Sequence, residues 1–278
     1  MSTWINGRRR ASLDHRDRGL QYGDGLFETM RVRHAQIRLL DLHLQRLYAG
    51  CKRLKIAAPA QPMLRAELQR IAAGRREGIL KLILTRGSGA KNARPGYRPS
   101  GEERCTRIET LHALSAALRH TDPAAAVRVK LCRTPVSVNP ALAGLKTLNR
   151  LDSVLARSEW SDERIWEGLM SDADGHWVCG TMSNLFVRRG SILTTPPVNR
   201  SGVAGVMRRW VMQSAGKAQL RARQREIRWQ DLQAADEVFM TNAVVGIRSV
   251  RSIEGGGKPV KFERFEASGE LRALLESR

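Results

Sequence analysis

One lysine stands where an uncharged stretch of the chain meets a stretch that resembles the start of a helix. Residues 134–145 (TPVSVNPALAGL) carry no charge, and Lys146 follows them directly. Burial beside apolar chain disfavours the charged form of an amine and lowers its pKa. A neutral amine is a nucleophile that forms Schiff bases with carbonyl compounds. Lys146 is therefore the first candidate for catalysis, although most lysines are solvated residues whose long side chains reach water.

Three other segments have residue types that suit a bound phosphate. Residues 201–205 (SGVAG) precede an expected helix, and backbone N–H groups at a helix start attract anions. Arg46, on another expected helix, offers a rigid fork of N–H donors. Thr241 and Asn242 follow the apolar run 238–240, although small polar residues at a strand end are also ordinary turn formers. Each segment alone also fits a turn or a surface arginine, so only their combination indicates a site.

The hydrophobic pattern places these candidates on the elements of an α+β chain. Helical spacing predicts helices over 41–56, with Asp41 as its cap, and over 62–73, 147–160 and 203–215. Alternating or continuous apolar runs predict strands at 4–7, 26–32, 37–39, 79–84, 127–132, 166–171, 177–179, 185–188, 192–194, 237–241 and 247–250. Turn residues near Asp122 predict a boundary between two lobes, residues 1–118 and 125–278, with a linker at 119–124.

The composition argues against several classes of protein. The 278 residues are 42% hydrophobic, which suits a folded core and argues against disorder. No run is long enough to span a membrane, and the N-terminus lacks the apolar segment of a secretory signal. The four cysteines form no CxxC pair and no metal-ligand spacing. Reduced thiols, a cytoplasmic location and no bound metal are therefore expected.

The net charge of +21 suggests anionic ligands or nucleic acid as partners. The basic residues are spread along the whole chain, with modest clusters at residues 8–10 and 217–228, and aromatic residues make up only 5%. A protein that binds single strands interleaves basic residues with aromatic side chains that stack on bases. This pattern favours a solvated arginine-rich surface over nucleic-acid binding.

Several motifs along the chain occur in the order seen in one enzyme family. They are residues 22–28 (YGDGLFE), 43–47 (HLQRL), 144–151 (GLKTLNRL), 180–186 (GTMSNLF), 202–205 (GVAG) and 241–242 (TN). With these motifs the chain resembles the fold type IV pyridoxal-phosphate enzymes, a family that includes branched-chain and D-amino-acid aminotransferases and 4-amino-4-deoxychorismate lyases. Residues 144–151 look most like the lyases. The resemblance implies the two-lobed α+β fold of that family, pyridoxal 5′-phosphate as cofactor, and a homodimer.

The resemblance also implies roles for individual residues. Lys146 would be the Schiff-base lysine. Arg46 would bind the cofactor phosphate, together with the backbone N–H groups of Val203 and Ala204. Thr241 and Asn242 would contribute to the same phosphate site.

The loop 86–98 is long, basic and rich in glycine and proline. Its residues Arg94 and Tyr97 are weaker candidates for contacts with substrate carboxylates, because most such loops are merely solvated.

One position departs from the family pattern. The family usually has a glutamate just before the Gly-Thr-x-Ser-Asn stretch, where it bonds the pyridine nitrogen of the cofactor. Here that position is Cys179, and a neutral thiol is only a weak hydrogen-bond partner. A transaminase, which relies on the ring as an electron sink, should lose most from this change. A lyase whose product becomes aromatic should lose less.

The sequence therefore predicts a lyase that converts 4-amino-4-deoxychorismate to 4-aminobenzoate and pyruvate in folate synthesis. Three alternatives remain open at this point. They are an aminotransferase of the same fold, a relative left weakly active by Cys179, and a basic nucleic-acid-binding protein without catalysis.

Overall fold

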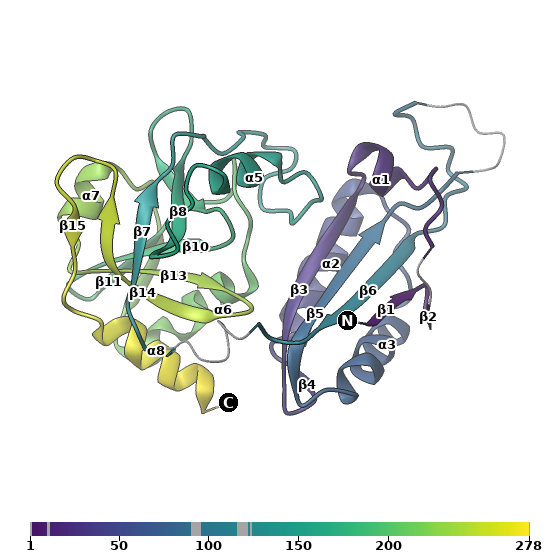
Figure 1. The fold of residues 1–278 in the computed structure, drawn as a ribbon, viewed down its shortest axis with the longest axis horizontal. Coiled ribbons are helices and arrows are strands. Elements are labelled where there is room, and N and C mark those ends of the chain that lie inside the picture. The colour runs from purple at the N-terminus through teal and green to yellow at the C-terminus, as the bar shows by residue number, and fades with distance from the viewer. Residues whose placement is uncertain (1, 10–11, 90–95, 116–121, 123, 278) are drawn as a thin grey trace. The chain divides into compact units, whose positions relative to one another are not determined.

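The chain divides into two compact units in a computed structural model, which describes residues 2–9, 12–89, 96–115, 122 and 124–277 (Figure 1). The first unit comprises Met1–Arg119 and Leu145–Asn149, and the second comprises His120–Gly144 and Arg150–Arg278. The main boundary falls at the start of the linker expected at 119–124. Residues 145–149, which carry Lys146, belong with the first unit and not with the C-terminal lobe in which the sequence pattern placed them.

The first unit is built on a six-stranded antiparallel sheet. Its strands, in spatial order, are β2 (Arg8–Arg9), β1 (Ser2–Ile5), β6 (Thr106–His112), β5 (Glu77–Thr85), β3 (Gly25–Arg33) and β4 (Gln36–Ile37). Helices α2 (Leu40–Leu54) and α3 (Gln61–Ala73) cover one face, and the short helix α1 (Arg18–Tyr22) precedes β3 (Figure 1). Alternate residues of β3 and β5 point into the core under these helices, which is the period-2 pattern of a half-buried strand.

The core of the first unit also explains why residues 145–149 pack there. Leu145 is buried and belongs to the same hydrophobic cluster as Leu26, Leu44 and Leu84. Thr147 forms an antiparallel bridge with Leu26. The segment thus adds an apolar side chain and backbone hydrogen bonds to the first unit.

The second unit contains a nine-stranded mixed sheet. Its main path, in spatial order, is β12 (Arg221–Gln224), β11 (Ile192–Thr195), β10 (Asn184–Arg189), β13 (Glu237–Asn242), β14 (Gly246–Glu254), β7 (Val127–Leu131), β8 (Ile165–Ser171) and β9 (Trp177–Gly180), with β15 (Val260–Lys261) paired to β14. Strand β9 also pairs with β10 through Cys179 and Asn184, so six strands close into a ring. This closure brings residues that are distant along the chain to one seam.

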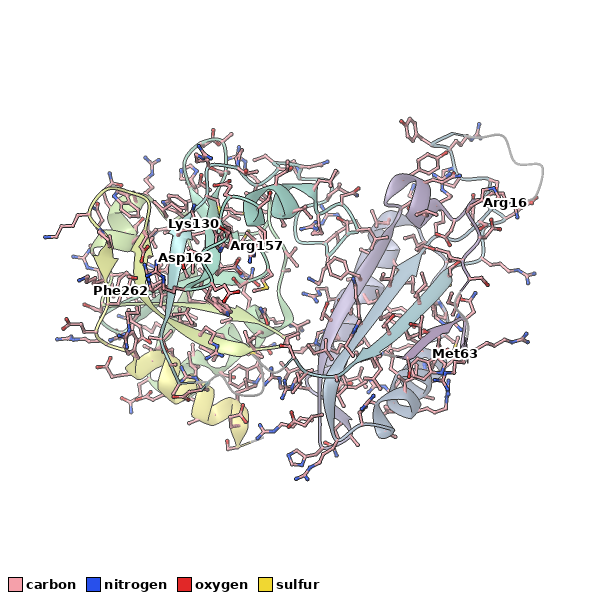
Figure 2. The ribbon with its side chains drawn as sticks, in the orientation of Figure 1. Arg16, Met63, Lys130, Arg157, Asp162 and Phe262 are labelled. Carbon is pink, nitrogen blue, oxygen red and sulfur yellow. The ribbon has the colours of Figure 1, made fainter. Side chains whose placement is uncertain are left out.

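Helices lie around the second sheet. They are α5 (Leu151–Arg157), α6 (Val206–Ser214), the 3-10 turn η1 (Ala215–Ala218), α7 (Trp229–Gln233) and α8 (Glu266–Glu276). Arg157 and Lys130, both labelled in Figure 2, lie against Trp160, with Cζ 4.5 Å and Nζ 5.9 Å from its ring centroid. Both cations thus lie within cation–π range of a ring that belongs to a buried apolar cluster.

Much of the excess positive charge is on the surface, as the sequence pattern predicted. The edge strands β2 and β12 each carry exposed arginines: Arg8 and Arg9 on one, Arg221 and Arg223 on the other. Charged side chains on an edge strand discourage pairing with another chain. None of the described helices has the length and apolarity needed to cross a membrane.

Candidate active site

Lys146 lies on an extended segment and not at the start of a helix. The Phe27 N–H donates to the Lys146 carbonyl at 2.9 Å, and the Leu148 N–H donates to the Gly25 carbonyl at 3.1 Å. These bonds align the segment with strand β3 and use peptide groups that a helix would need. The expected helix over 147–160 was therefore wrong at its beginning, and α5 starts at Leu151.

The amine of Lys146 lies over an aromatic ring of the same unit. Its Nζ is 4.1 Å from the centroid of Phe27, and the side chain is half-buried. A cation over an aromatic face is attracted by the ring's quadrupole. Lys146 is thus partly enclosed, with an aromatic ring on one side.

Arg46, the expected phosphate ligand, is held by a buried carboxylate in the first unit. Its Nε donates to Glu28 Oε1 at 2.8 Å, and its Nη2 also bonds the Glu28 carboxylate. His43 Nδ1 lies 2.6 Å from Glu28 Oε2. Glu28 and His43 are 2% and 1% exposed, so this is an interior ion pair with a histidine attached. It fixes the direction of a guanidinium that has five N–H donors.

The charges in this cluster follow from its burial. Burial opposes ionisation of Glu28, but the charges and hydrogen bonds of Arg46 and His43 outweigh it and lower the pKa of Glu28 to about 2. Burial lowers the pKa of His43, and the charges of Arg46 and Lys146 lower it further, against the opposing effect of Glu28. His43 is therefore neutral at pH 7 and donates Nδ1–H to Glu28.

The second unit provides the expected anion site at the start of α6. Gly202 has φ +76°, a left-handed conformation that glycine adopts without strain, and it turns the chain toward the helix. The Ala204 N–H donates to the Gly144 carbonyl at 3.0 Å. Of the two N–H groups expected to bind phosphate, the one on Ala204 already has this backbone acceptor. The expectation then depends mainly on Val203 and on the N–H groups at the helix start.

Asn184 joins three of the expected site residues at the seam of the second sheet. It pairs with Cys179 across β9 and with Thr241 across β13. Its Nδ2 donates to the Val203 carbonyl at 2.9 Å, and a Cβ on Gly205 would collide with its Oδ1. Asn184 therefore sets the position of the turn before α6. It stood in a recognised motif, but no local pattern indicated this role.

Thr241 and Asn242 end strand β13 beside this seam. Thr241 is fully buried, and its Oγ1 has no hydrogen-bond partner among the described residues. A buried hydroxyl without a partner is costly, so it suits a site that a ligand completes. Asn242 Oδ1 accepts the N–H groups of Val244 and Val245 at 3.0 and 2.9 Å, and its amide N–H groups are its remaining donors.

Cys179 is buried next to a carboxylate that the sequence did not single out. Burial raises the pKa of the Cys179 thiol to about 12, and the nearby charge of Glu167 acts in the same direction. Glu167 is fully buried and accepts hydrogen bonds from Thr181 and from Ser183 Oγ at 2.7 Å. It thereby holds the turn that follows Cys179. Its only sequence signal was a lone acid in the apolar strand 165–171.

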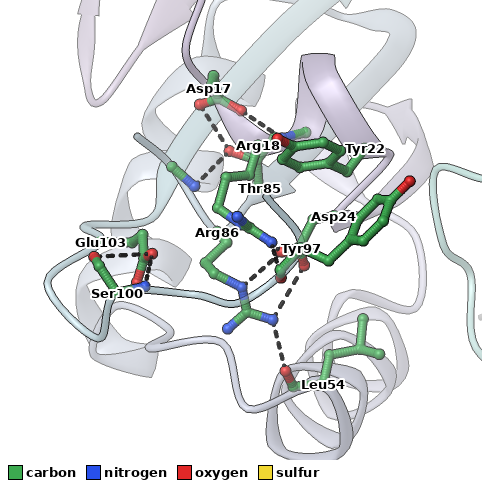
Figure 3. A network of polar contacts seen from close by, with 12 residues as sticks. Asp17, Arg18, Tyr22, Asp24, Leu54, Thr85, Arg86, Tyr97, Ser100 and Glu103 are labelled. Carbon is green, nitrogen blue, oxygen red and sulfur yellow. Dashed lines mark hydrogen bonds and ion pairs between the residues drawn. The ribbon is translucent and has the colours of Figure 1, made fainter. Parts of the chain in front are cut away.

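The structure describes only one of the two candidates for substrate contact. Arg94 lies outside the described residues. Tyr97 is 85% exposed, and its ring lies edge-on to Tyr22 with centroids 5.5 Å apart. Its carbonyl accepts from Arg18 Nη2 at 2.6 Å (Figure 3).

The backbone at Tyr97 is held by a polar network in the first unit. Arg18 Nε and Arg86 Nε both donate to Asp24 Oδ2, at 3.0 and 2.7 Å (Figure 3). Arg86 also donates to the carbonyls of Leu54 and Lys55, at the end of α2. The loop end that carries Tyr97 is thus tied to strand β3 and helix α2 through two arginines and one aspartate.

Comparisons with known proteins identify the family of the chain. The model of the class IV amino-transferase family matches residues 25–253. The chain belongs to this family. It is 30% identical to an aminodeoxychorismate lyase of Vibrio harveyi over 280 residues, which cover 99% of each chain. It is 26% identical to a D-alanine aminotransferase of Bacillus licheniformis over 262 residues, covering 92% of this chain and 89% of that one.

A solved structure gives a further likeness. The crystal structure of 4-amino-4-deoxychorismate lyase from Pseudomonas aeruginosa has 40% sequence identity and a TM-score of 0.89, covering 99% of this chain and 98% of that one. These findings confirm the predicted family and the α+β fold.

Proposed function

We propose that this class IV family member is a pyridoxal-phosphate-dependent lyase that converts 4-amino-4-deoxychorismate to 4-aminobenzoate and pyruvate. The observation that carries the proposal is the 40% identity, over nearly the whole chain, to a 4-amino-4-deoxychorismate lyase. The +21 charge would also draw an anionic substrate toward the enzyme.

Each unit, taken by itself, has residues whose chemistry suits a group of pyridoxal phosphate. Thr241 Oγ1 is a buried hydroxyl that has no hydrogen-bond partner among the residues described, and the start of α6 favours an anion. Arg46 is directed by Glu28 and suits a phosphate oxygen. Lys146 is the amine proposed to hold the aldehyde. When bound, the cofactor supplies an electron-withdrawing ring that stabilises negative charge on the substrate.

We propose that Lys146 also moves the proton in the reaction. With cofactor and substrate bound, Nζ would serve as the base that takes the proton from substrate C4. The carbon–oxygen bond to the enolpyruvyl group would then break, and Nζ would return the proton to the methylene carbon of the departing enolpyruvate, which gives pyruvate. Phe27, 4.1 Å from Nζ, limits the directions that this amine can take.

Cys179 favours the lyase over an aminotransferase. With its pKa raised to about 12 by burial, the thiol is neutral at physiological pH and brings no negative charge to its surroundings. Formation of an aromatic product lowers the demand on the ring as an electron sink. The second candidate function is an aminotransferase, which the 26% identity to a D-alanine aminotransferase supports.

The test is to incubate the purified protein with 4-amino-4-deoxychorismate and to measure both products, in parallel with amino-group transfer from D- and branched-chain amino acids. We expect 4-aminobenzoate and pyruvate in equal amounts, and little transfer. Lys146→Ala should abolish both the products and the visible absorption band that borohydride bleaches. Lys81→Ala is a matched control, because Lys81 Nζ also lies near Phe27, at 5.7 Å. Transfer without pyruvate release would overturn the lyase assignment.

We further propose that the enzyme is a cytoplasmic homodimer. Helix α5 carries three large apolar side chains, Leu151, Val154 and Leu155, that are 76%, 59% and 60% exposed. Such a face supports a contact with a second copy. Light scattering should give twice the chain mass, and Leu155→Glu should shift it to one chain mass, whereas Leu20→Glu, at a site 65% exposed in the first unit, should not. An unchanged mass in the Leu155 variant would exclude this face from the dimer contact.

A further inference from the structure

A buried arginine lies in the first turn of α6, and none of the roles considered so far uses it. Arg208 is 7% exposed. Its Nη2 donates to the Pro196 carbonyl and to Gln224 Oε1, both at 2.8 Å, and its Nε donates to Thr195 Oγ1 at 3.3 Å. All three of these acceptors are neutral groups. The guanidinium is thus hydrogen-bonded, but these bonds bring no negative charge to it.

This position is unfavourable for a cation for two reasons. A buried charge is costly unless an opposite charge compensates it, and burial lowers the pKa of Arg208 accordingly. The N-terminal end of a helix also carries partial positive charge, which repels a cation in the first turn. The first turn of α6 contains no acidic residue that would offset either effect.

An anion at the start of α6 would offset both effects. Arg208 is three residues beyond the N-cap Gly205, about 5 Å along the helix axis at the usual rise per residue. A second feature of the same place indicates a ligand. Thr241 Oγ1 is buried with no hydrogen-bond partner among the described residues, and Thr241 is paired in the sheet with Asn184, which contacts Gly205.

We infer that Arg208 is an electrostatic component of the phosphate site, which strengthens binding of a dianion at the start of α6 through its charge and without touching the ligand. This inference rests on the proposed function, which places the cofactor phosphate there. The inference adds a buried cation to the backbone N–H groups at the start of α6 and the Thr241 hydroxyl, which belong to the same unit. It also explains why an arginine occupies a helix turn where its charge costs stability in the absence of a ligand.

Neutralising the charge in place separates this role from a packing role. Gln224 is exposed and its Oε1 already bonds Arg208, so Gln224→Glu puts a carboxylate on the guanidinium while keeping the arginine and its hydrogen bonds. Arg208→Gln removes the charge directly, and Arg208→Lys keeps it. The matched controls are Arg209→Gln, at the exposed neighbouring residue, and Gln233→Glu, at an exposed site on α7.

The experiment measures binding of inorganic phosphate and of pyridoxal phosphate to the cofactor-free protein by calorimetry, with thermal unfolding to show that each variant is folded. At an effective dielectric of about 20, a unit charge about 10 Å from a singly charged anion changes its affinity by at least about tenfold, and the effect on a dianion is larger. We expect at least about tenfold weaker binding in Arg208→Gln and Gln224→Glu, and a change of less than about threefold in Arg208→Lys and both controls. We also expect Gln224→Glu to raise the unfolding temperature of the ligand-free protein, because it compensates the buried charge.

The outcomes are distinct. Wild-type affinity in Gln224→Glu, with the protein folded, would overturn the inference even if Arg208→Gln fails to fold. Equal weakening in Arg208→Lys and Arg208→Gln would indicate that only the shape of the guanidinium matters, which also overturns it. If the wild-type protein binds neither phosphate nor pyridoxal phosphate, the proposed cofactor site itself is wrong.

Discussion

Glu109 should make the stability of the first unit depend on pH in an unusual direction. This residue of β6 is fully buried, opposite Trp4 and Leu82, and neither carboxyl oxygen has a hydrogen-bond partner among the described residues. Burial and the nearby charge of Glu67 raise its pKa from 4.5 to about 7, against the opposing charge of Arg107. At one pKa unit per 1.36 kcal/mol, ionised Glu109 costs the folded state up to about 3 kcal/mol.

The sign of the effect follows from which state holds the proton. Below pH 4.5 both the folded and the unfolded chain carry a protonated Glu109, so there is no cost. Between about pH 4.5 and 7 the unfolded chain releases its proton first, and the free energy of unfolding falls. Above pH 7 the full cost is present.

Glu109→Gln removes this titration with little change of shape. We expect the variant to be more stable than the wild-type protein by up to about 3 kcal/mol at pH 8.5, and to differ little at pH 5. Urea unfolding followed by circular dichroism at both pH values measures the difference. Glu102→Gln, at an exposed site in the same unit, is the control. If the variant is destabilised equally at both pH values, ionisation of the Glu109 carboxyl does not lower the stability of the folded protein.

Three further predictions concern the site. Asn184→Ala should weaken pyridoxal-phosphate binding about tenfold, since it frees the turn before α6, and fluorescence titration measures this; unchanged affinity would remove Asn184 from the site. Glu28→Gln should lower the free energy of unfolding by about 2–3 kcal/mol at pH 7 and by little at pH 2. The reason is that a Glu28 pKa lowered to about 2 stabilises the folded state above pH 4.5, and this stabilisation is lost as the pH falls from 4.5 to 2. Urea unfolding at both pH values measures the difference, and an equal loss at both would contradict the prediction. Cys179→Glu should raise amino-group transfer more than pyruvate release, and equal effects on both rates would count against the proposed role of the neutral thiol.

The sequence by itself determined the family, the fold class and most of the elements. Repeats of apolar residues at helical spacing predicted helices that became α2 and α3, and alternation predicted β3. These signals are local, because a helix or strand shows its buried face within a few residues. Motif order along the chain then identified the lysine, the arginine and the turn before α6 as candidates.

Only the tertiary structure decided what surrounds those candidates. Lys146 lies on an extended segment because Leu145 is buried in the first core and Thr147 pairs with Leu26, neither of which a local pattern reveals. Asn184 meets Cys179, Thr241 and Val203 because the second sheet closes on itself.

The same holds for the charges. Whether a glutamate is ionised or an arginine costs stability depends on burial and on neighbours from other strands and helices. Glu109, Glu167 and Arg208 therefore look like ordinary charged residues in the sequence, and it is the fold that buries their charge.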